Sequence, residues 1–431
     1  MHLARRAYLL VFLTALLAVA GIWSPPGEYR GLWRVPLALL LLGLAAEGLA
    51  LRRLQLGVRL AAAGRRFLGR PQPSALLLSN PASRPLLVEY LPLLPAGFEP
   101  LGGPRRVSVP AGATVEDPLV LTPVRLGPQR WAALPARVLG ALRLAWWSRE
   151  LAPEGAVVIA PDTLGARAPT RGLPAGARSR RIAGAGAELY QLRRYVRGDP
   201  LPRIDWKATA RTGTLITREY SEDQHLDVLV AIDAGRFSRV RAGALDRFGL
   251  YANLAARFAE AATGNDDRIG LVVYADRVLA SCPPARGLAG VTRLRSALEA
   301  LSVQAAESDP LTAAIRIRSL LKHRGLIVLL TDLDDASIAD RLARAVRLLS
   351  PPHLAVVAGV RNEEIAALAQ RPAHLWQDPW VALAAAEHEA RAALQRSLLR
   401  RLGAPVVSAP QELLERAVFA EYEALRHLRR V

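Results

Sequence analysis

The chain has 431 residues, 51% of them hydrophobic, and a mean hydropathy of +0.16, which excludes a disordered chain and indicates a membrane-embedded part. A single cysteine, Cys282, excludes a disulfide framework and a cysteine-based zinc cluster. The net charge is +19, and nearly all of the basic residues are arginine, which is typical of a compositional bias. No nucleic-acid-binding motif accompanies these arginines.

Two apolar runs open the chain, Ala7–Trp23 and Val35–Leu51, and a short link rich in Pro and Gly joins them. Each run is near the lower length limit for a spanning helix, so residues 1–54 predict a transmembrane hairpin. The alternative is a cleaved signal peptide in the first run, with Ala18-Val-Ala20 as its cleavage site. Arginine placement predicts that both ends of the hairpin and the soluble domains are cytoplasmic. The arginines concerned are Arg5, Arg6, Arg52, Arg53, Arg59, Arg65, Arg66 and Arg70.

The middle of the chain has a different pattern. In residues 55–160, short apolar runs alternate with Pro, Gly and Asn turns, which predicts a β-rich, Ig-like sandwich. No catalytic constellation lies in it, so we interpret it as a spacer or docking module. Residues 161–225 predict a loop-rich segment, and within it residues 186–220 are unusually dense in arginine.

Asp199 and Asp205 stand among these arginines. Arg–carboxylate pairs can be bidentate, so one interpretation is an ion-pair network that holds an irregular segment in place. A second is a partner-binding surface with exposed arginines and Trp206 as its anchor. Nuclease-like metal chemistry through the two carboxylates is disfavoured, because the surrounding arginines repel a divalent cation.

From residue 226 the pattern alternates between buried strands and helices, which predicts a doubly wound α/β domain over 226–431. Two predicted strands end in Asp233 and Asp332. If these strands are neighbours, both carboxylates face one crevice at the carboxyl edge of the sheet. Such oxygen ligands suit Mg²⁺, and the candidate assisting residues are Thr312, Thr331 and Asp334.

The stretch Tyr190–Arg211, YQLRRYVRGDPLPRIDWKATAR, resembles the signature of the family called domain of unknown function 58. The matching residues are Leu192, Arg193, Tyr195, Gly198, Asp199, Arg203, Ile204, Asp205, Trp206, Lys207, Ala210 and Arg211, while Arg194 stands where the family usually has Glu. The order of hairpin, β-rich domain, signature and α/β domain is also similar to that family. The resemblance implies a bacterial protein of the inner or cell membrane with two spans and a MoxR-type AAA+ ATPase as its partner.

The α/β domain resembles von Willebrand factor type A domains, whose metal-dependent adhesion site begins with a DxSxS motif. Asp233 matches the first Asp of that motif, Asp332 the late Asp, and Thr312 the Thr, but Gly235 and Phe237 replace the two serines. The loss of both hydroxyl ligands argues against a bound metal. No cofactor is therefore predicted, with Mg²⁺ as the alternative.

The predicted function is that of a non-enzymatic, membrane-anchored adaptor that works with an AAA+ ATPase in the assembly or maturation of protein complexes. Two alternatives stay open. One is a metal-dependent hydrolase that uses Asp233 and Asp332. The other is binding to anionic lipid or nucleic acid through the arginine surplus.

Overall fold

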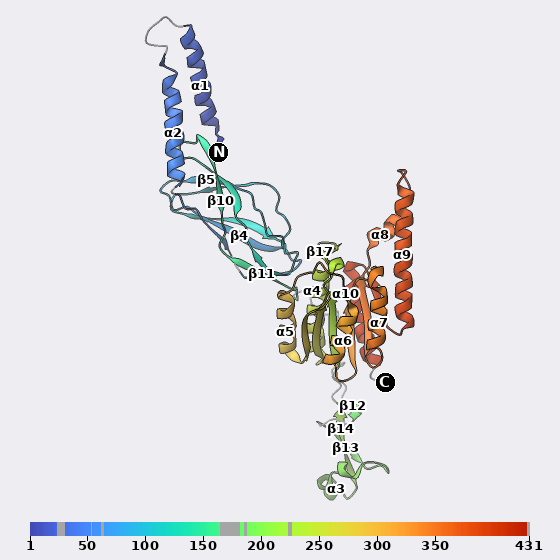
Figure 1. Ribbon diagram of the computed structural model, residues 1–431. Helices are drawn as coiled ribbons and strands as arrows, with labels where there is room; N and C mark the ends of the chain where they lie inside the picture. The colour runs from blue at the N-terminus through green and yellow to red at the C-terminus, as the bar shows by residue number, and fades with distance from the viewer. Residues whose placement is uncertain are drawn as a thin grey trace. The chain divides into compact units, whose positions relative to one another are not determined.

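The computed structural model describes residues 1–23, 31–52, 54–61, 64–163, 182–184, 188–222 and 226–428. The chain folds into two compact units, Met1–Pro161 and Asp162–Val431 (Figure 1). Most of the link between the two apolar runs, and most of the predicted loop at 161–181, lie outside the described residues.

The first unit begins with an antiparallel pair of helices, α1 (Arg5–Ile22) and α2 (Arg34–Arg52) (Figure 1). By length and composition both could cross a membrane. α1 is exposed along most of its length. α2 buries one stripe at intervals of three and four residues, as expected for a helix with one covered face. The stripe consists of Pro36, Leu40, Gly43, Glu47 and Leu51.

The rest of the first unit is built of short strands. They form sheets of the orders β1-β10-β9-β5-β6, β2-β4-β7 and β3-β11-β8, in which every strand pair except β3–β11 is antiparallel. The strands are β1 (His2–Leu3), β2 (Gly57–Ala61), β3 (Arg65–Phe67), β4 (Gln72–Ser79), β5 (Leu86–Tyr90), β6 (Arg105–Val109), β7 (Thr114–Leu121), β8 (Gly127–Arg130), β9 (Leu134–Leu139), β10 (Ala145–Leu151) and β11 (Ala156–Ala160). In β7 burial alternates along Asp117–Leu121, so one face of the strand lies against the core. The finer assignment to an Ig-like sandwich stays a prediction.

Glu47 ties the helices to these strands. Its carboxylate accepts hydrogen bonds from the backbone N–H of Leu144 and of Ala145, each at 3.2 Å, and from the indole N–H of Trp147 at 3.4 Å. A Cβ at Gly140 would lie 2.1 Å from this carboxyl group, so glycine leaves the room that the contact needs. An acid in an apolar helix therefore acts as the attachment point for the β9–β10 turn.

The second unit contains a six-stranded sheet of the order β19-β18-β15-β20-β21-β22. All neighbouring pairs are parallel except β18–β19. The strands are β15 (Asp227–Asp233), β18 (Arg268–Tyr274), β19 (Val278–Ala285), β20 (Gly325–Leu330), β21 (Leu354–Val360) and β22 (Val406–Ala409). β20 is apolar along its whole length and β15 is apolar between its terminal Asp227 and Asp233, because helices cover both faces of the sheet.

The two faces are covered by different helices. α6 and α7 pack over the face that carries Leu229 and Leu329. The intervening Val228 and Val230 are fully buried and point to the opposite face, and α4 contacts β15 from that side. The helices are α4 (Arg247–Gly264), α5 (Gly287–Glu299), α6 (Pro310–Leu320), α7 (Ala339–Leu349), α8 (Glu363–Ala369), α9 (Asp378–Arg401) and α10 (Gln411–Leu428).

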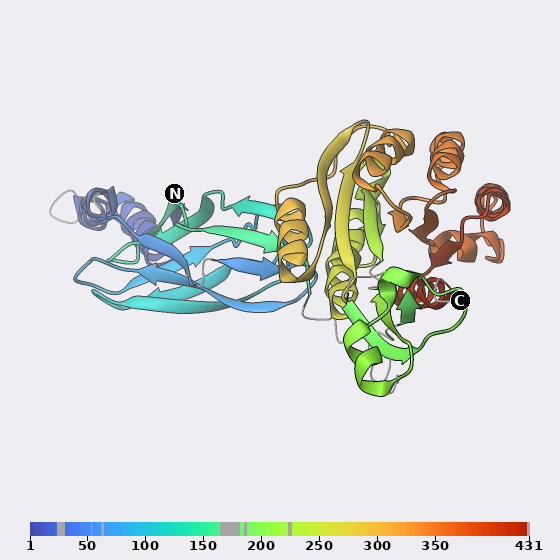
Figure 2. The ribbon, with the colours of Figure 1, turned by 90° about the horizontal axis from the view of Figure 1, so that it is seen from below.

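The segment with the family signature is more regular than the sequence predicted. In place of loops it has a small antiparallel sheet of the order β12-β14-β13, and a helix, α3, packs beside it (Figures 1 and 2). Its elements are β12 (Ile182–Gly184), β13 (Glu188–Arg194), α3 (Trp206–Thr212) and β14 (Ile216–Glu222). Charged residues interrupt the apolar alternation of these strands, and a register shift lies between Leu189 and Gln191, so the strand signal is weak in the sequence.

We expect Glu47→Leu to loosen the attachment of the helices to the β-rich part without weakening the apolar character of α2. The change removes the acceptor of two buried N–H groups, and each unsatisfied donor costs about 1–3 kcal/mol. Thermal unfolding of the full chain in detergent, followed by tryptophan fluorescence, should show a lower Tm. The control is Glu150→Leu, on the exposed side of β10. Equal Tm values for the two variants would contradict this account.

Candidate functional site

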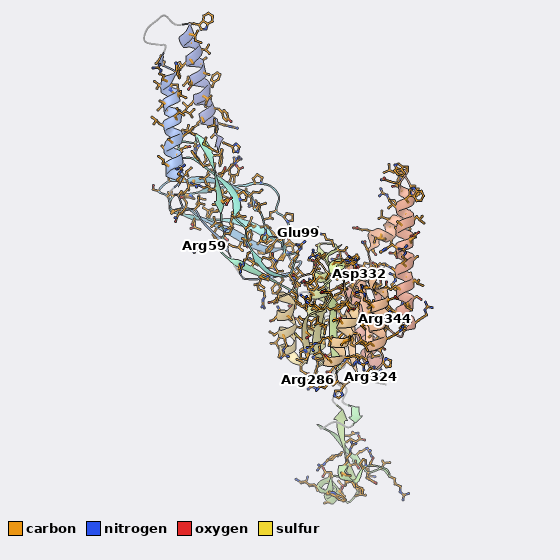
Figure 3. The ribbon with its side chains drawn as sticks, viewed as in Figure 1. Arg59, Glu99, Arg286, Arg324, Asp332 and Arg344 are labelled. Carbon is orange, nitrogen blue, oxygen red and sulfur yellow. The ribbon has the colours of Figure 1, made fainter. Side chains whose placement is uncertain are left out.

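Asp233 and Asp332 lie at the same edge of the six-stranded sheet. Asp233 ends β15, and Asp332 follows β20 by two residues. These strands are parallel neighbours, so both carboxylates lie at their carboxyl ends, on one edge of the sheet. Figure 3 labels Asp332 on the α/β domain. Both side chains are buried, with exposed fractions of 2% for Asp233 and 6% for Asp332.

Both oxygens of the Asp233 carboxylate accept hydrogen bonds from neighbouring donors. One oxygen accepts hydrogen bonds from the Gly235 N–H at 2.8 Å and from the Ser308 hydroxyl, and the other accepts one from the Thr331 hydroxyl at 2.8 Å. Burial raises the pKa of Asp233, and these three donors oppose the rise. A Cβ at Gly235 would lie 2.1 Å from the Ser308 hydroxyl, which explains why a glycine stands there.

The carboxylate of Asp332 is paired with an arginine. The Arg247 guanidinium forms an ion pair with Asp332 and approaches Asp334 to 3.8 Å, and Arg396 also lies 3.8 Å from Asp334. Arg247 is only 4% exposed, so this is a buried cation between two carboxylates. Burial raises the pKa of Asp332, while the positive charge of Arg247 lowers it.

These contacts do not suit a metal ion. Gly235 and Phe237 offer no side-chain oxygen, and the Thr312 hydroxyl donates to Asp309 at 2.6 Å. Thr312 lies in the first turn of α6, where the Asp309 cap holds it. Arg247 already supplies the positive charge that a metal would bring to Asp332. Among the described residues, no three His, Cys, Asp or Glu side chains gather around one point that could hold a metal.

Sequence reasoning missed Ser308 and Arg247. They stand 75 and 85 residues from their partners Asp233 and Asp332, and no motif spacing links them. The signal that could have drawn attention to Arg247 is its place directly after the Asp246 cap at the start of α4, on a helix whose other early residues are apolar.

In the signature, Arg193 is the centre of an ion-pair network. Its guanidinium makes two hydrogen bonds of 2.8 Å to the carboxylate of Asp199 and one to Glu219 on the neighbouring strand. Asp199 also accepts the Val196 N–H at 2.9 Å and the Thr217 hydroxyl at 3.3 Å. This network closes the turn that follows β13.

Asp205 has a second structural role as the N-cap of α3. It accepts the N–H groups of Lys207 and Ala208 at 3.0 Å and the guanidinium of Arg218 at 2.9 Å. Gly198 has φ +111°, which only glycine adopts readily. These residues of the predicted partner-binding set therefore shape the module.

Other members of the predicted set face outward. Trp206 is 66% exposed although it is a large aromatic, and Lys207 and Arg211 on the same short helix are exposed. Tyr195 and Arg203 are half-buried. The signature thus divides into an internal ion-pair network and a small exposed face, which we call the α3 face and define as Trp206, Lys207 and Arg211.

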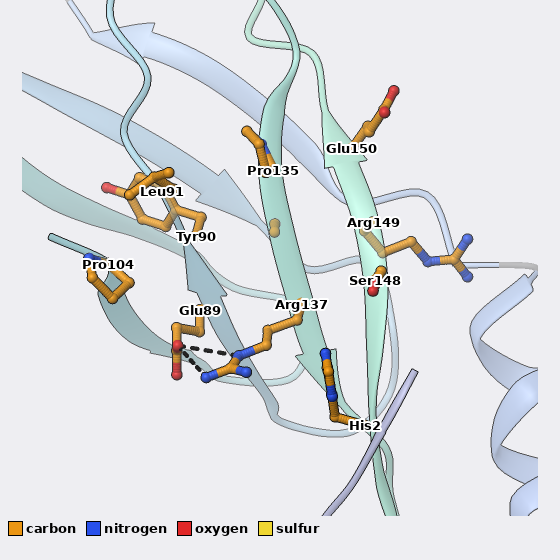
Figure 4. Close-up of a pocket in the computed structure, with 11 residues that line it drawn as sticks. His2, Glu89, Tyr90, Leu91, Pro104, Pro135, Arg137, Ser148, Arg149 and Glu150 are labelled. Carbon is orange, nitrogen blue, oxygen red and sulfur yellow. Dashed lines mark hydrogen bonds and ion pairs between the residues drawn. The ribbon is translucent and has the colours of Figure 1, made fainter.

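A cavity of about 650 Å³ lies in the first unit, against β5, β9 and β10 (Figure 4). Glu89 in its wall pairs with Arg137 and with Arg106, at 2.5 Å and 2.7 Å. The hydrogen bond from Arg106 is the main cause of the lowered pKa of Glu89. The carboxylate is thus held ionised between strands, which suits a cross-strand tie better than a catalytic acid.

Residues 191–398 match the model of the family described as "Protein of unknown function DUF58", which confirms the resemblance predicted from the signature. A comparison with curated proteins finds no match. The chain is similar to the solved structure of the conserved hypothetical protein BatB from Bacteroides thetaiotaomicron, at 12% identity over 46% of this chain and 99% of that chain, with a TM-score of 0.30.

Two other solved structures are similar to parts of the chain. The SpRpn10 VWA domain is 16% identical over 44% of this chain and 92% of that chain, with a TM-score of 0.27. An uncharacterized membrane spanning protein from Vibrio fischeri is 14% identical over 47% of this chain and 99% of that chain, with a TM-score of 0.16.

We expect Arg247→Ala to destabilise the α/β domain strongly. Removing one partner of a buried ion pair typically costs about 3–5 kcal/mol, because a charge is left uncompensated. The control is Arg236→Ala, whose ion pair with Glu307 is half-exposed and should contribute less than about 1 kcal/mol. Urea titration of the full chain in detergent compares the two. A variant lacking Arg247 that unfolds at the wild-type urea concentration would contradict the assigned role.

The turn after β13 should depend on pH through Asp199. Hydrogen bonds from Arg193, and next from the Val196 N–H, hold the pKa of Asp199 at about 2. Because an unfolded Asp titrates near 3.9, its contribution to stability is complete above about pH 4 and is lost as the pH falls toward 2. Hydrogen exchange of the Val196 amide, corrected for its intrinsic rate, should show protection that declines in this window. In Asp199→Asn the decline should be absent; its persistence there would assign the effect to another group.

Proposed function

We propose that this chain, whose residues 191–398 match the DUF58 family model, is a membrane-anchored adaptor that binds a protein partner and catalyses no reaction itself. The partner class that the family resemblance implies is a MoxR-type AAA+ ATPase. In this proposal the ATPase supplies the energy for the assembly or maturation of protein complexes, and the chain supplies the location and the specificity.

The observation that carries the proposal is the α3 face. A tryptophan that is 66% exposed, next to two exposed cations, has the composition of the residues that dominate binding energy at protein interfaces. The internal network around Arg193 holds the segment that leads to α3, and Asp205 caps α3 itself. A preorganised face of this kind loses little conformational entropy when it binds.

The buried carboxylates favour an adaptor over a hydrolase. A catalytic Asp directs its oxygens at substrate or metal, whereas both oxygens of Asp233 accept hydrogen bonds from within the chain, from Ser308, Thr331 and Gly235. Asp332 is neutralised by Arg247. The hydrogen bonds and the ion pair of Asp233 and Asp332 hold the ends of β15 and β20 in a fixed position. A rigid edge of this kind suits a domain that binds a protein partner through its surface.

The placement of charge supports a cytoplasmic location for the soluble parts. Arg5 and Arg6 begin α1 and Arg52 ends α2, so three of the four arginines in the two helices lie at the ends joined to the β-rich part, and Arg34 lies at the opposite end of α2. The positive-inside rule orients such a hairpin with these ends in the cytoplasm.

Co-purification tests the proposal directly. Tagged full-length protein is extracted from native membranes in mild detergent with nucleotide present, and Trp206→Ala is expected to lose the ATPase that the wild type retains. The matched control is Trp380→Ala, because Trp380 is 67% exposed and lies on a different helix, α9.

The outcomes separate the candidate functions. An ATPase lost with Trp206→Ala but kept with Trp380→Ala supports the adaptor and locates its interface. Absence of any ATPase in every nucleotide state would overturn the partner class. Release of a bound partner by moderate salt alone would favour the electrostatic alternative, because contacts between exposed charges are screened.

A further inference from the structure

The turn between β9 and β10, Gly140–Leu144, is fixed against the two apolar helices. Leu144 packs with Ala7 of α1 and Leu40 of α2 in one buried cluster. The backbone of Ala4 donates to the Leu144 carbonyl at 2.7 Å, and Arg6 donates to the Leu142 carbonyl at 3.4 Å. The position of the turn along the helices is therefore set within the first unit.

The turn contacts α2 halfway along its length. A Cβ on Gly43 would lie 2.5 Å from a methyl of Leu144 and 3.3 Å from one of Leu142, so the turn meets the helix at this glycine. Gly43 lies nine positions after Arg34, which stands at the far end of α2, and this distance corresponds to about 14 Å of helix. The hydrocarbon core of a bilayer is about 30 Å thick. The part of α2 beyond the turn is therefore too short to cross the core, whereas α1 begins at the turn, where Ala4 donates to Leu144, and its 18 residues extend about 27 Å. If α1 crosses the core, the turn lies at the near boundary of the hydrocarbon.

The composition of the turn suits a membrane surface. Leu142 is 48% exposed, and Arg143 beside it is exposed as well. Arg5 and Arg6 lie at the start of α1, next to the turn. None of these three arginines forms an ion pair with a carboxylate in the described part of the chain, so their charges are available. Arginines at this depth extend their guanidinium groups to lipid phosphates.

From this geometry we infer that the β9–β10 turn inserts into the membrane surface, with Leu142 at the acyl boundary and Arg5, Arg6 and Arg143 on the phosphates of anionic lipids. The inference rests on the membrane anchoring in the proposed function. It adds the β9–β10 turn to the helices α1 and α2 as a third part of the chain that contacts the membrane. Together with the Glu47 attachment, it fixes the β-rich part at a defined depth and tilt on the bilayer.

The test uses the single cysteine of the chain. In full-length protein carrying Cys282→Ser, Leu142→Cys is labelled with the fluorophore NBD and reconstituted into vesicles of phosphatidylcholine and phosphatidylglycerol. Val120→Cys is the matched control, because Val120 lies on β7 of the same unit and is 56% exposed. The label at 142 should show blue-shifted emission, quenching by doxyl lipids and protection from dithionite. The label at 120 should show none of these.

A second pair of variants tests the charges. Arg143→Glu should make the label at 142 more accessible to dithionite in the anionic vesicles, whereas Arg125→Glu, at an exposed position away from the turn, should leave it unchanged. Equal accessibility at 142 and 120 in protein that resists carbonate extraction would overturn the insertion while the anchor stands. Release of the protein by carbonate would overturn the anchor and the insertion together.

Discussion

A buried carboxylate must find hydrogen-bond donors or a cation inside the protein, and this constraint organises both units of the chain. The buried acids that the structure describes are Glu47, Glu89, Asp117, Asp162, Asp233, Asp267, Asp332 and Asp335. Each has a partner, which is an arginine, a tyrosine, a hydroxyl or a backbone N–H. An unpaired buried charge costs several kcal/mol. The elements that carry each acid and its partner must therefore pack next to each other.

The same constraint separates structure from recognition. At the edge of the six-stranded sheet, Arg247 supplies the positive charge that the buried Asp332 requires. The chain itself thus provides the counter-ion of this carboxylate. In the signature, Asp199 and Asp205 are engaged by arginines and backbone N–H groups, whereas the side chains of the α3 face are exposed. A conspicuous charged motif can thus be largely structural, while an adjacent tryptophan stays exposed.

In the first unit this constraint couples the two apolar helices, α1 and α2, to the strands. Glu47 would be costly in an apolar helix, but the turn between β9 and β10 supplies its donors. The attachment makes the helices and the strands one body, and a movement of the β-rich part therefore requires a movement of the helices. This coupling gives the two helices and the strands a fixed geometry instead of a flexible connection.

The sequence by itself determined the elements whose signal is local. The apolar runs around α1 and α2 predicted two helices long and apolar enough to span. The apolar runs that end in Asp233 and precede Asp332 predicted buried parallel strands, because burial on both faces removes polar residues. Only the tertiary structure decided the partners of those acids. Ser308, Arg247 and the turn at Leu144 reach Asp233, Asp332 and Glu47 across 75, 85 and 97 residues. Side chains so distant in sequence meet only when strand order and helix packing are set, and no local pattern encodes that order.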